Sequence, residues 1–223
     1  MAKLELIVFD WDGTVMDSTA AIAMAIRGAA EDLGLRVPTL AQAAHVIGLG
    51  LSDALQQAVP DLKPDQIDAF TERYRVHYFA SDPELMPFAG IPELLESLSA
   101  GPLPVAVATG KSRAGLNRVL DALDWRKHFI STRCADEGLP KPDPWMLNDL
   151  IEELGVSAQG TVMIGDTTHD LGMARAANVS AIAVTYGAHP DHVLKTEPSL
   201  AMVDDVAALE ACLLGLQRDG LHG

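Results

Sequence analysis

Short apolar runs recur along the chain and alternate with longer segments of helical period. The runs, rich in β-branched and small apolar side chains, are residues 4–9, 103–108, 161–164 and 180–184, with a weaker one at 128–131. Helical periodicity marks residues 91–99, 113–123, 144–154 and 169–177. Strands that alternate with helices in this way predict a parallel sheet covered on both faces, a doubly wound, Rossmann-like α/β core.

Residues 18–81 break this alternation, because no strand is predicted among them. Helices are expected instead at 18–33, 39–46 and 52–59, followed by a long one from Pro64 to about Phe79. Proline suits the first turn of a helix, where its missing N–H does no harm. The segment therefore predicts an all-α block.

We expect this block to be a helical cap domain inserted after the first strand. Its predicted range is 15–83, which leaves 1–14 and 84–223 as the α/β core. Residues 15–17 would leave the core, and Pro83 and Pro87 would mark the return.

Composition narrows the class of protein. The chain has 223 residues and a formal net charge of −15, which argues against a nucleic-acid partner because such proteins normally carry a basic face. Its two cysteines give neither a disulfide framework nor a zinc cluster, and no apolar run is long enough for a membrane span or a signal peptide. We expect a cytoplasmic protein, a monomer or weak homodimer.

Four polar sites follow predicted strands, at the sheet edge where open α/β proteins bind ligands. The first is Phe9–Thr14, FDWDGT. Asp10 could attack phosphorus as a carboxylate nucleophile, and Asp12 could protonate the leaving oxygen and then activate water. A solvated turn is the alternative.

The second and third sites offer phosphate-binding groups. Thr109, Gly110 and Lys111 follow the run 103–108, and a hydroxyl with loop N–H groups suits a phosphate oxygen. The alternative is an ordinary helix cap, by Thr109 or Ser112. Lys141 lies between two prolines in LPKPDP, which would present its ammonium rigidly; the alternative is a surface lysine.

The fourth site, IGDTTHD, supplies acids for a metal. Asp166 leaves a strand and, with Asp10, offers the carboxylates that Mg²⁺ prefers. Asp170 is expected to open the next helix and to support the ligands rather than bind the metal. His169 is expected to be a bystander, because Mg²⁺ prefers oxygen.

In this order, the four motifs resemble those of the haloacid dehalogenase-like hydrolase superfamily, and the helical insert resembles the cap of its phosphoglycolate phosphatase-like subfamily. The resemblance implies that Asp10 is the nucleophile and Asp12 the general acid/base, with Thr109 and Lys141 as phosphate binders. It also implies Mg²⁺ ligated by the carboxylates of Asp10 and Asp166 and by the Asp12 carbonyl.

Differences from the motifs of particular relatives reduce the number of reactions that we expect. The founding dehalogenases lack the second acid, so Asp12 disfavours carbon–halogen hydrolysis. Phosphonoacetaldehyde hydrolases use a cap lysine, but Lys63 lies in a turn and is expected to be solvated. The β-phosphoglucomutases carry an arginine that the stretch 47–53 lacks. We expect a phosphatase acting on a small phosphorylated metabolite; the alternatives are a phosphosugar mutase and a non-catalytic phosphate-binding scaffold.

The cap is expected to choose the substrate. His45 and Gly48 lie in the loop that we expect to face the leaving group, where His45 could donate a hydrogen bond and Gly48 would allow close approach. In the long cap helix, Arg73 and Arg75 cannot share a narrow face, whereas Arg73 and His77 can. For Arg73 and His77, a substrate role and a solvated helix face are both open. The tail from residue 191 to residue 223 is expected to close the core, and His189 has no spacing that predicts a ligand.

Overall fold

The computed structural model describes residues 2–81 and 86–221. Its centre is one parallel sheet of six strands in the order β3-β2-β1-β4-β5-β6. The strands are β1 (Leu6–Phe9), β2 (Val105–Thr109), β3 (Ser131–Cys134), β4 (Thr161–Gly165), β5 (Ser180–Val184) and β6 (Ala201–Val203). The chain adds strands on one side of β1 and then on the other, so the order reverses between β1 and β4. The predicted doubly wound α/β fold is confirmed.

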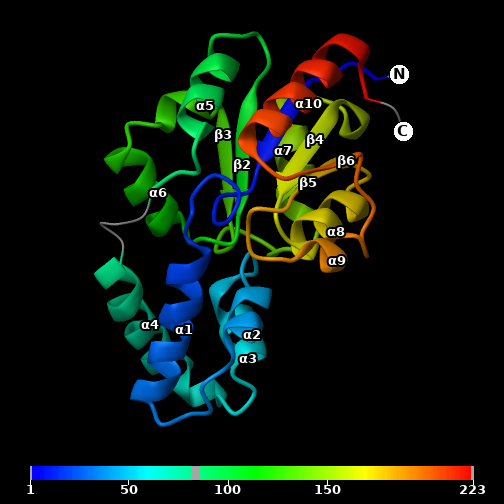
Figure 1. Ribbon diagram of the computed structural model, residues 1–223. Coiled ribbons are helices and arrows are strands. Elements are labelled where there is room, and N and C mark those ends of the chain that lie inside the picture. Colours follow the sequence, from blue (N-terminus) through cyan, green and yellow to red (C-terminus); the bar gives the residue numbers. More distant parts are fainter. Residues whose placement is uncertain (1, 82–85, 222–223) are drawn as a thin grey trace.

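Helices cover both faces of this sheet (Figure 1). The core helices are α5 (Ile91–Ser99), α6 (Arg113–Ala122), α7 (Trp145–Leu154), α8 (Thr168–Ala176), α9 (Asp191–Leu194) and α10 (Val206–Asp219). β1 alternates between two apolar clusters: Ile7 and Phe9 pack with α5, α6 and α10, while Leu6 and Val8 pack with α7 and α8. Because both faces are buried, the strand is apolar throughout rather than alternating.

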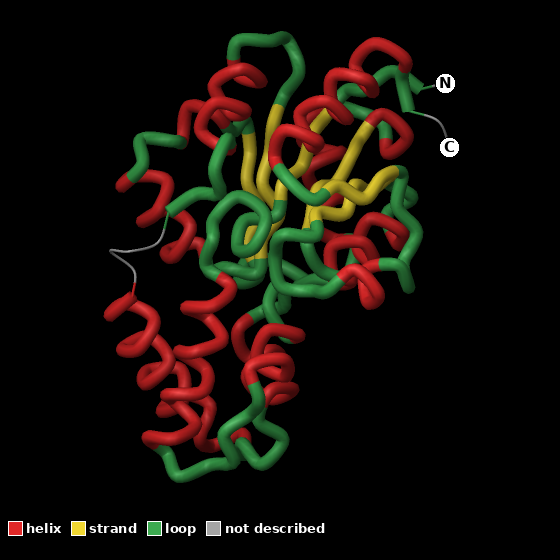
Figure 2. Tube along the Cα trace, viewed as in Figure 1, coloured by secondary structure: helices red, strands yellow, loops and turns green. Residues whose placement is uncertain are grey.

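The inserted block contains only helices among its described residues (Figure 2). They are α1 (Thr19–Asp32), α2 (Leu40–His45), α3 (Leu51–Ala58), the 3₁₀ turn Pro64–Gln66 and α4 (Ile67–Ser81). Buried residues such as Ile26, Leu55 and Phe70 give the block an apolar cluster of its own. The predicted all-α character is therefore found, at the carboxyl edge of the sheet.

The connections into and out of the block lie side by side. Asp17 N donates to Met86 O at 3.0 Å, and Phe88 N donates to Val15 O at 3.1 Å. The segment expected to leave the core and the segment expected to return to it at Pro87 are therefore hydrogen-bonded to each other. The expected return at Pro83, and with it the domain boundary, lies outside the described residues, and the division into 15–83 and the core stays a prediction.

One strand lies away from its predicted place. The weak apolar run at 128–131 predicted a strand there, but the structure has a 3₁₀ turn, Arg126–His128, and then β3. β3 is an edge strand of mostly polar residues, and Arg133 forms ion pairs with Asp149 and Glu153 of α7. The buried Phe129, which produced the apolar signal, anchors the connection instead. β6 forms the other edge of the sheet, and α9 was not predicted.

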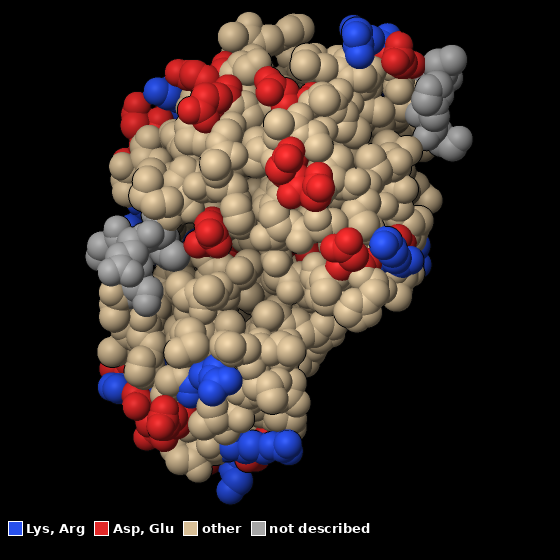
Figure 3. All heavy atoms as spheres, in the orientation of Figure 1, with Lys and Arg blue, Asp and Glu red and all other residues tan. Residues whose placement is uncertain are grey.

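Charge on the surface agrees with the composition. Acidic side chains are spread over the core and the helical block, and the basic ones form small separate groups on the face in Figure 3. No helix among the described residues is long and apolar enough to cross a membrane.

Candidate active site

The loop that leaves β1 carries two of the expected acids, Asp10 and Asp12. Gly13 then turns the chain with a φ of 88°, in the left-handed region that glycine tolerates best. A Cβ atom at Gly13 would lie 2.1 Å from Oδ2 of Asp166. The turn requires glycine both for its backbone conformation and for its closeness to the acid that follows β4.

Three buried carboxylates meet at this edge of the sheet. Asp10 follows β1, Asp166 follows β4, and Asp170 lies in the first turn of α8; none is more than 1% exposed. One oxygen atom from each lies within 4.8 Å of the others. Pairing of β1 with β4 brings the first two together, because Asp10 N donates to Ile164 O at 2.8 Å. Clustered carboxylate oxygens of this kind suit a hard divalent cation.

Lys141 faces two of these acids. Its Nζ donates to Oδ1 of Asp10 at 2.5 Å and to Oδ1 of Asp170 at 2.6 Å, and its side chain is fully buried. Burial alone would lower the pKa of Lys141, but the two carboxylates raise it above its ordinary value, so the ammonium stays charged. The alternative of a surface lysine is therefore wrong.

Even with Lys141, the cluster has an excess of negative charge. Burial raises the pKa of Asp10 well above its usual range, and the charge on Asp170 adds to this, with only partial compensation from Lys141. Burial also raises the pKa of Asp166 to about 7, again with Asp170 contributing. Oδ2 of Asp10 is buried and has no hydrogen-bond partner among the described residues. An unpartnered oxygen in an electron-rich site fits a bound Mg²⁺.

The other carboxylate oxygens of the cluster are held in place. Asp166 accepts from Thr14 Oγ1 at 2.9 Å and from Ala188 N at 2.6 Å. Asp170 accepts from both the N–H and the hydroxyl of Thr167, at 3.1 Å and 2.6 Å. Since Lys141 and Thr167 occupy both oxygens of Asp170, its geometry fits the expected supporting role. Sequence reasoning did not identify Thr14, although its place in the first motif was a signal.

Asp12 has partners from the core and from the helical block. Ser18 Oγ donates to its Oδ1 at 2.7 Å. Lys111 Nζ lies 2.9 Å and 3.0 Å from its two oxygens and also donates to Tyr78 Oη, on α4, at 3.1 Å. Lys111, expected to bind substrate, thus contacts the second acid in this structure, and its binding to phosphate stays a prediction. Ser18 and Tyr78 were missed; no motif marks them.

The loop after β2 lies at the same edge. Thr109 is fully buried, and its Oγ1 accepts from Lys111 N at 3.1 Å. The cap of α6 is Ser112, whose side chain accepts from Gly115 N, so Thr109 is left for the site. A Cβ atom at Gly110 would lie 2.6 Å from the carbonyl oxygen of Gly48, which shows how closely the cap loop approaches.

Three histidines connect the cap loop to the core beside the site. The carbonyl oxygen of His45 accepts from Nε2 of His169 and Nε2 of His189, both at 2.9 Å. Thr168 N donates to Nδ1 of His189, which places the ring proton on Nε2. Burial lowers the pKa of His189 to about 4, so this ring is neutral.

The three rings also pack against one another beside the site. The ring of His45 stacks on that of His189 with centroids 4.7 Å apart, and His45 is not among the described residues that line the pocket. Its contact with the leaving group stays a prediction. His189, which no spacing marked as a ligand, anchors the cap loop through the carbonyl oxygen of His45. His169 donates to the same carbonyl oxygen, and its role as a bystander to metal binding stays a prediction.

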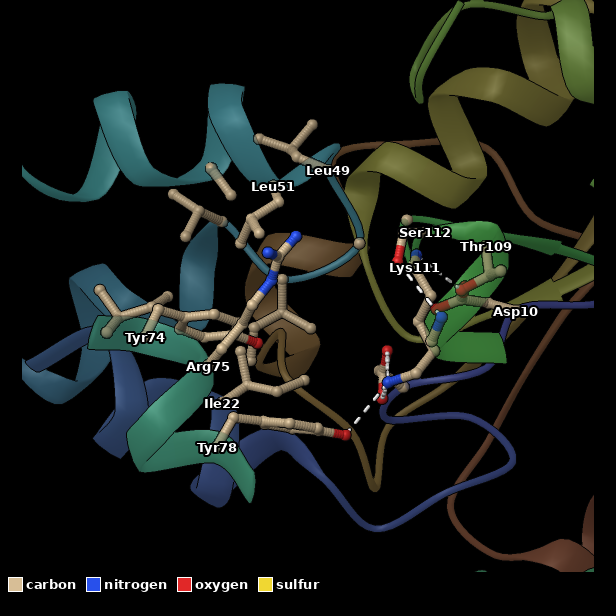
Figure 4. A pocket seen from close by; sticks show the side chains of 18 of the residues that line it. Asp10, Ile22, Leu49, Leu51, Tyr74, Arg75, Tyr78, Thr109, Lys111 and Ser112 are labelled. Atoms are coloured by element: carbon tan, nitrogen blue, oxygen red, sulfur yellow. Dashed lines mark hydrogen bonds and ion pairs between the residues drawn. The ribbon is translucent and has the colours of Figure 1, made fainter. Parts of the chain in front are cut away.

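A pocket opens between the helical block and the loops after β1 and β2 (Figure 4). Its core side includes Asp10, Asp12, Thr109, Gly110 and Lys111. Gly48 lines it from the cap, as expected. The nucleophile candidate, the acid/base candidate and the phosphate-binding loop therefore share one opening.

The order and placement of these groups match a known family. The model of the haloacid dehalogenase-like hydrolases matches residues 7–184. The chain belongs to this family. A phosphoglycolate phosphatase of Agrobacterium fabrum is 32% identical over 93% of this chain and 91% of its own length. A probable phosphatase, IndB, of Dickeya dadantii is 34% identical, with 89% of each chain covered.

Solved structures of family members show the same fold. A predicted phosphoglycolate phosphatase from Haemophilus somnus aligns with a TM-score of 0.84 and 24% identity, covering 96% of this chain and 99% of that one. The predicted resemblance to the phosphoglycolate phosphatase-like subfamily is confirmed, and so is the enzyme class, phosphoric monoester hydrolase. Lys63 is exposed, in keeping with the expectation that it is no Schiff-base lysine.

Proposed function

We propose that this enzyme hydrolyses a small phosphate monoester, with Mg²⁺ bound, through an aspartyl-phosphate formed on Asp10. The observation that carries the proposal is the state of Asp10. It lines the pocket, yet Oδ2 has no partner while Lys141 holds Oδ1. One oxygen is thus held by the ammonium, while the other has no hydrogen-bond partner among the described residues.

The residues can perform two in-line steps. In the first, a carboxylate oxygen of Asp10 bonds to phosphorus, the bond from phosphorus to the alcohol oxygen breaks, and Asp12 gives that oxygen its proton. In the second, Asp12 takes a proton from water, whose oxygen bonds to phosphorus as the bond to Asp10 breaks. Lys141 and Thr109 would hold the phosphoryl oxygens during both steps, so positioning provides most of the catalysis.

The metal would be held by Asp10 and Asp166, and by the carbonyl of Asp12 if the resemblance to the family extends to that atom. When bound, Mg²⁺ would neutralise charge on the phosphoryl oxygens. The hydrogen bonds from Thr14 and Ala188 fix Asp166 for this role.

Mg²⁺ is expected to stabilise the fold more at alkaline than at acid pH. Asp166 has its pKa raised to about 7, so its contribution to stability is present below its unfolded pKa and is lost as the pH rises through 7. Mg²⁺ binds the deprotonated form and would restore that loss. Thermal unfolding with and without Mg²⁺ should show a larger shift at about pH 8 than at about pH 5. An equal shift at both would contradict a site made of these acids.

Asp12→Asn is expected to slow hydrolysis by an amount that depends on the leaving group. Alkyl esters need a proton on the departing oxygen, so kcat should fall on the order of 10²- to 10⁴-fold. 4-Nitrophenolate leaves without a proton, so the first step with 4-nitrophenyl phosphate should be nearly unchanged. Stopped-flow measurement of both steps tests this, and an equal loss of the first step for both esters would contradict the role of Asp12.

A phosphate-release screen over small phosphometabolites with Mg²⁺ tests the function as a whole. Phosphoglycolate is the first substrate to try, because relatives carry that activity in their names. Release of free phosphate is the expected result. Conversion of a sugar phosphate to an isomer would support the mutase instead, and inactivity on every ester would overturn the proposal.

A further inference from the structure

The pocket has two walls of different chemistry. The core wall is polar, with the acids and the phosphate-binding loop. The cap wall is largely aliphatic, with side chains of Ile22, Ile26, Val46, Ile47, Leu49 and Ala54. A two-carbon alcohol would leave most of this wall without contact, whereas a larger carbon body would cover it and remove apolar surface from water. The wall therefore favours a leaving group with an apolar body.

Among the described residues, three cationic side chains line the pocket, Lys111, Arg75 and Arg118, and the guanidinium of Arg118 lies over the ring of Phe79, 5.0 Å from its centroid. The loop at Gly48 and Leu49 presents its carbonyl oxygens, which are acceptors, to Gly110. Lys111 is held between Asp12 and Tyr78. The carbonyl groups cannot bind a carboxylate, and Lys111 would have to leave Asp12 to do so.

Arg75 differs from its neighbours on α4. Arg73 and His77 both contact Oδ2 of Asp32 on α1, at 2.5 Å and 2.9 Å, and so join two cap helices. Arg75 lines the pocket and has no hydrogen bond or ion pair within the part of the chain that the structure describes. Figure 4 shows its side chain extending from α4 towards Leu51, beside Tyr74. Its planar guanidinium can bind a carboxylate through two parallel hydrogen bonds.

We infer that Arg75 binds a carboxylate at the far end of the leaving group. The substrate class is a phosphate monoester whose alcohol carries an apolar or aromatic body between the ester oxygen and that carboxylate. This inference rests on the proposed function, and it separates this pocket from one shaped for glycolate alone. Charge strengthens it, because in a chain of net charge −15 a cation at the pocket that has no ion pair among the described residues is a specific attraction for an anion.

Four esters separate what the apolar body and the carboxylate of the leaving group contribute to binding. They are ethyl phosphate, phosphoglycolate, benzyl phosphate and 4-carboxybenzyl phosphate. All four leave as primary alcohols, so kcat/KM should follow binding more than leaving-group reactivity. We expect kcat/KM for 4-carboxybenzyl phosphate to be higher than kcat/KM for benzyl phosphate and for phosphoglycolate, on the order of tenfold or more. Equal values for the two benzyl esters, or a preference for phosphoglycolate over 4-carboxybenzyl phosphate, would overturn the inference.

Arg75→Gln and Arg73→Gln form a matched pair on one helix. Arg75→Gln should bring the ratio of kcat/KM for 4-carboxybenzyl over benzyl phosphate close to one. Arg73→Gln removes the same charge from the Asp32 contact and should keep the ratio of the unmodified enzyme. A ratio that survives Arg75→Gln, or that falls equally in both variants, would overturn the role of Arg75.

A binding measurement separates this inference from the proposed function. Calorimetry with Mg²⁺ on the Asp10→Asn variant should give a dissociation constant for 4-carboxybenzyl phosphate at least about tenfold below that for benzyl phosphate. If this ratio is found but the unmodified enzyme hydrolyses no ester, the proposed function is wrong and the ligand class stands. Hydrolysis of the benzyl esters with no difference in binding would leave the function standing and overturn the ligand class.

Discussion

Asp10→Asn is expected to abolish turnover while keeping the fold. The amide cannot form the acyl phosphate, so kcat should fall on the order of 10⁴-fold or more. Stability should be kept or increased without metal, because burial and Asp170 already raise the pKa of Asp10 and disfavour its charge. Phosphate release from 4-nitrophenyl phosphate with Mg²⁺, together with thermal unfolding, measures both effects.

Asp17→Asn is the matched control for that substitution. Asp17 lies seven residues further along the same segment, is exposed, and its backbone N–H pairs with Met86 O. The same change of charge there should leave turnover within about twofold, because exposed substitutions of this kind have small effects. Near-normal activity in Asp10→Asn would show that the nucleophile has been assigned wrongly.

Lys141→Met is expected to cost both stability and activity. It keeps an apolar stem of similar length but leaves Asp10 and Asp170 buried without their shared cation. Removing one partner of a buried ion pair costs about 3–5 kcal/mol of unfolding free energy. Activity should fall as well, because the ammonium would hold the phosphoryl group. Urea unfolding without metal and phosphate release measure the two losses.

Two further variants separate these effects. Lys127→Met removes an exposed lysine paired with the exposed Asp124, and it should change stability by no more than about 0.5 kcal/mol. Adding Asp170→Asn to Lys141→Met removes one of the stranded charges and should restore part of the stability but not the activity. If Lys141→Met were as stable as the Lys127 control, the buried ion pair would not contribute as described.

The core fold was predictable because local signals agree with tertiary structure there. β1 is buried on both faces, so it is apolar throughout, and the run ends abruptly at Asp10. Because the strands are parallel, their carboxyl ends place the other motifs at the same edge of the sheet. The helix at 91–99 and the strand at 180–184 have the predicted bounds. β3 was misplaced because an edge strand held by arginine ion pairs carries no apolar pattern.

Contacts between cap and core were not predictable in the same way. Tyr78 reaches Lys111, which in turn contacts Asp12, only because α4 packs where it does, and its place in the helix periodicity is that of an ordinary core residue. His45 was chosen from a loop that does face the site, but its carbonyl is bound by two core histidines and its ring stacks on one of them. Sequence spacing cannot show which side of a loop faces the substrate.

The covalent intermediate on Asp10 can be trapped in the Asp12→Asn variant. With 4-nitrophenyl phosphate and Mg²⁺, the first step needs no proton from residue 12, whereas the second lacks its base and should be slow. We expect a burst of nitrophenolate stoichiometric with enzyme. After acid quenching and digestion, mass spectrometry should find one added phosphoryl group on the peptide that contains Asp10. The same burst with an unmodified Asp10 peptide, or with the phosphoryl group on another residue, would contradict the proposed mechanism.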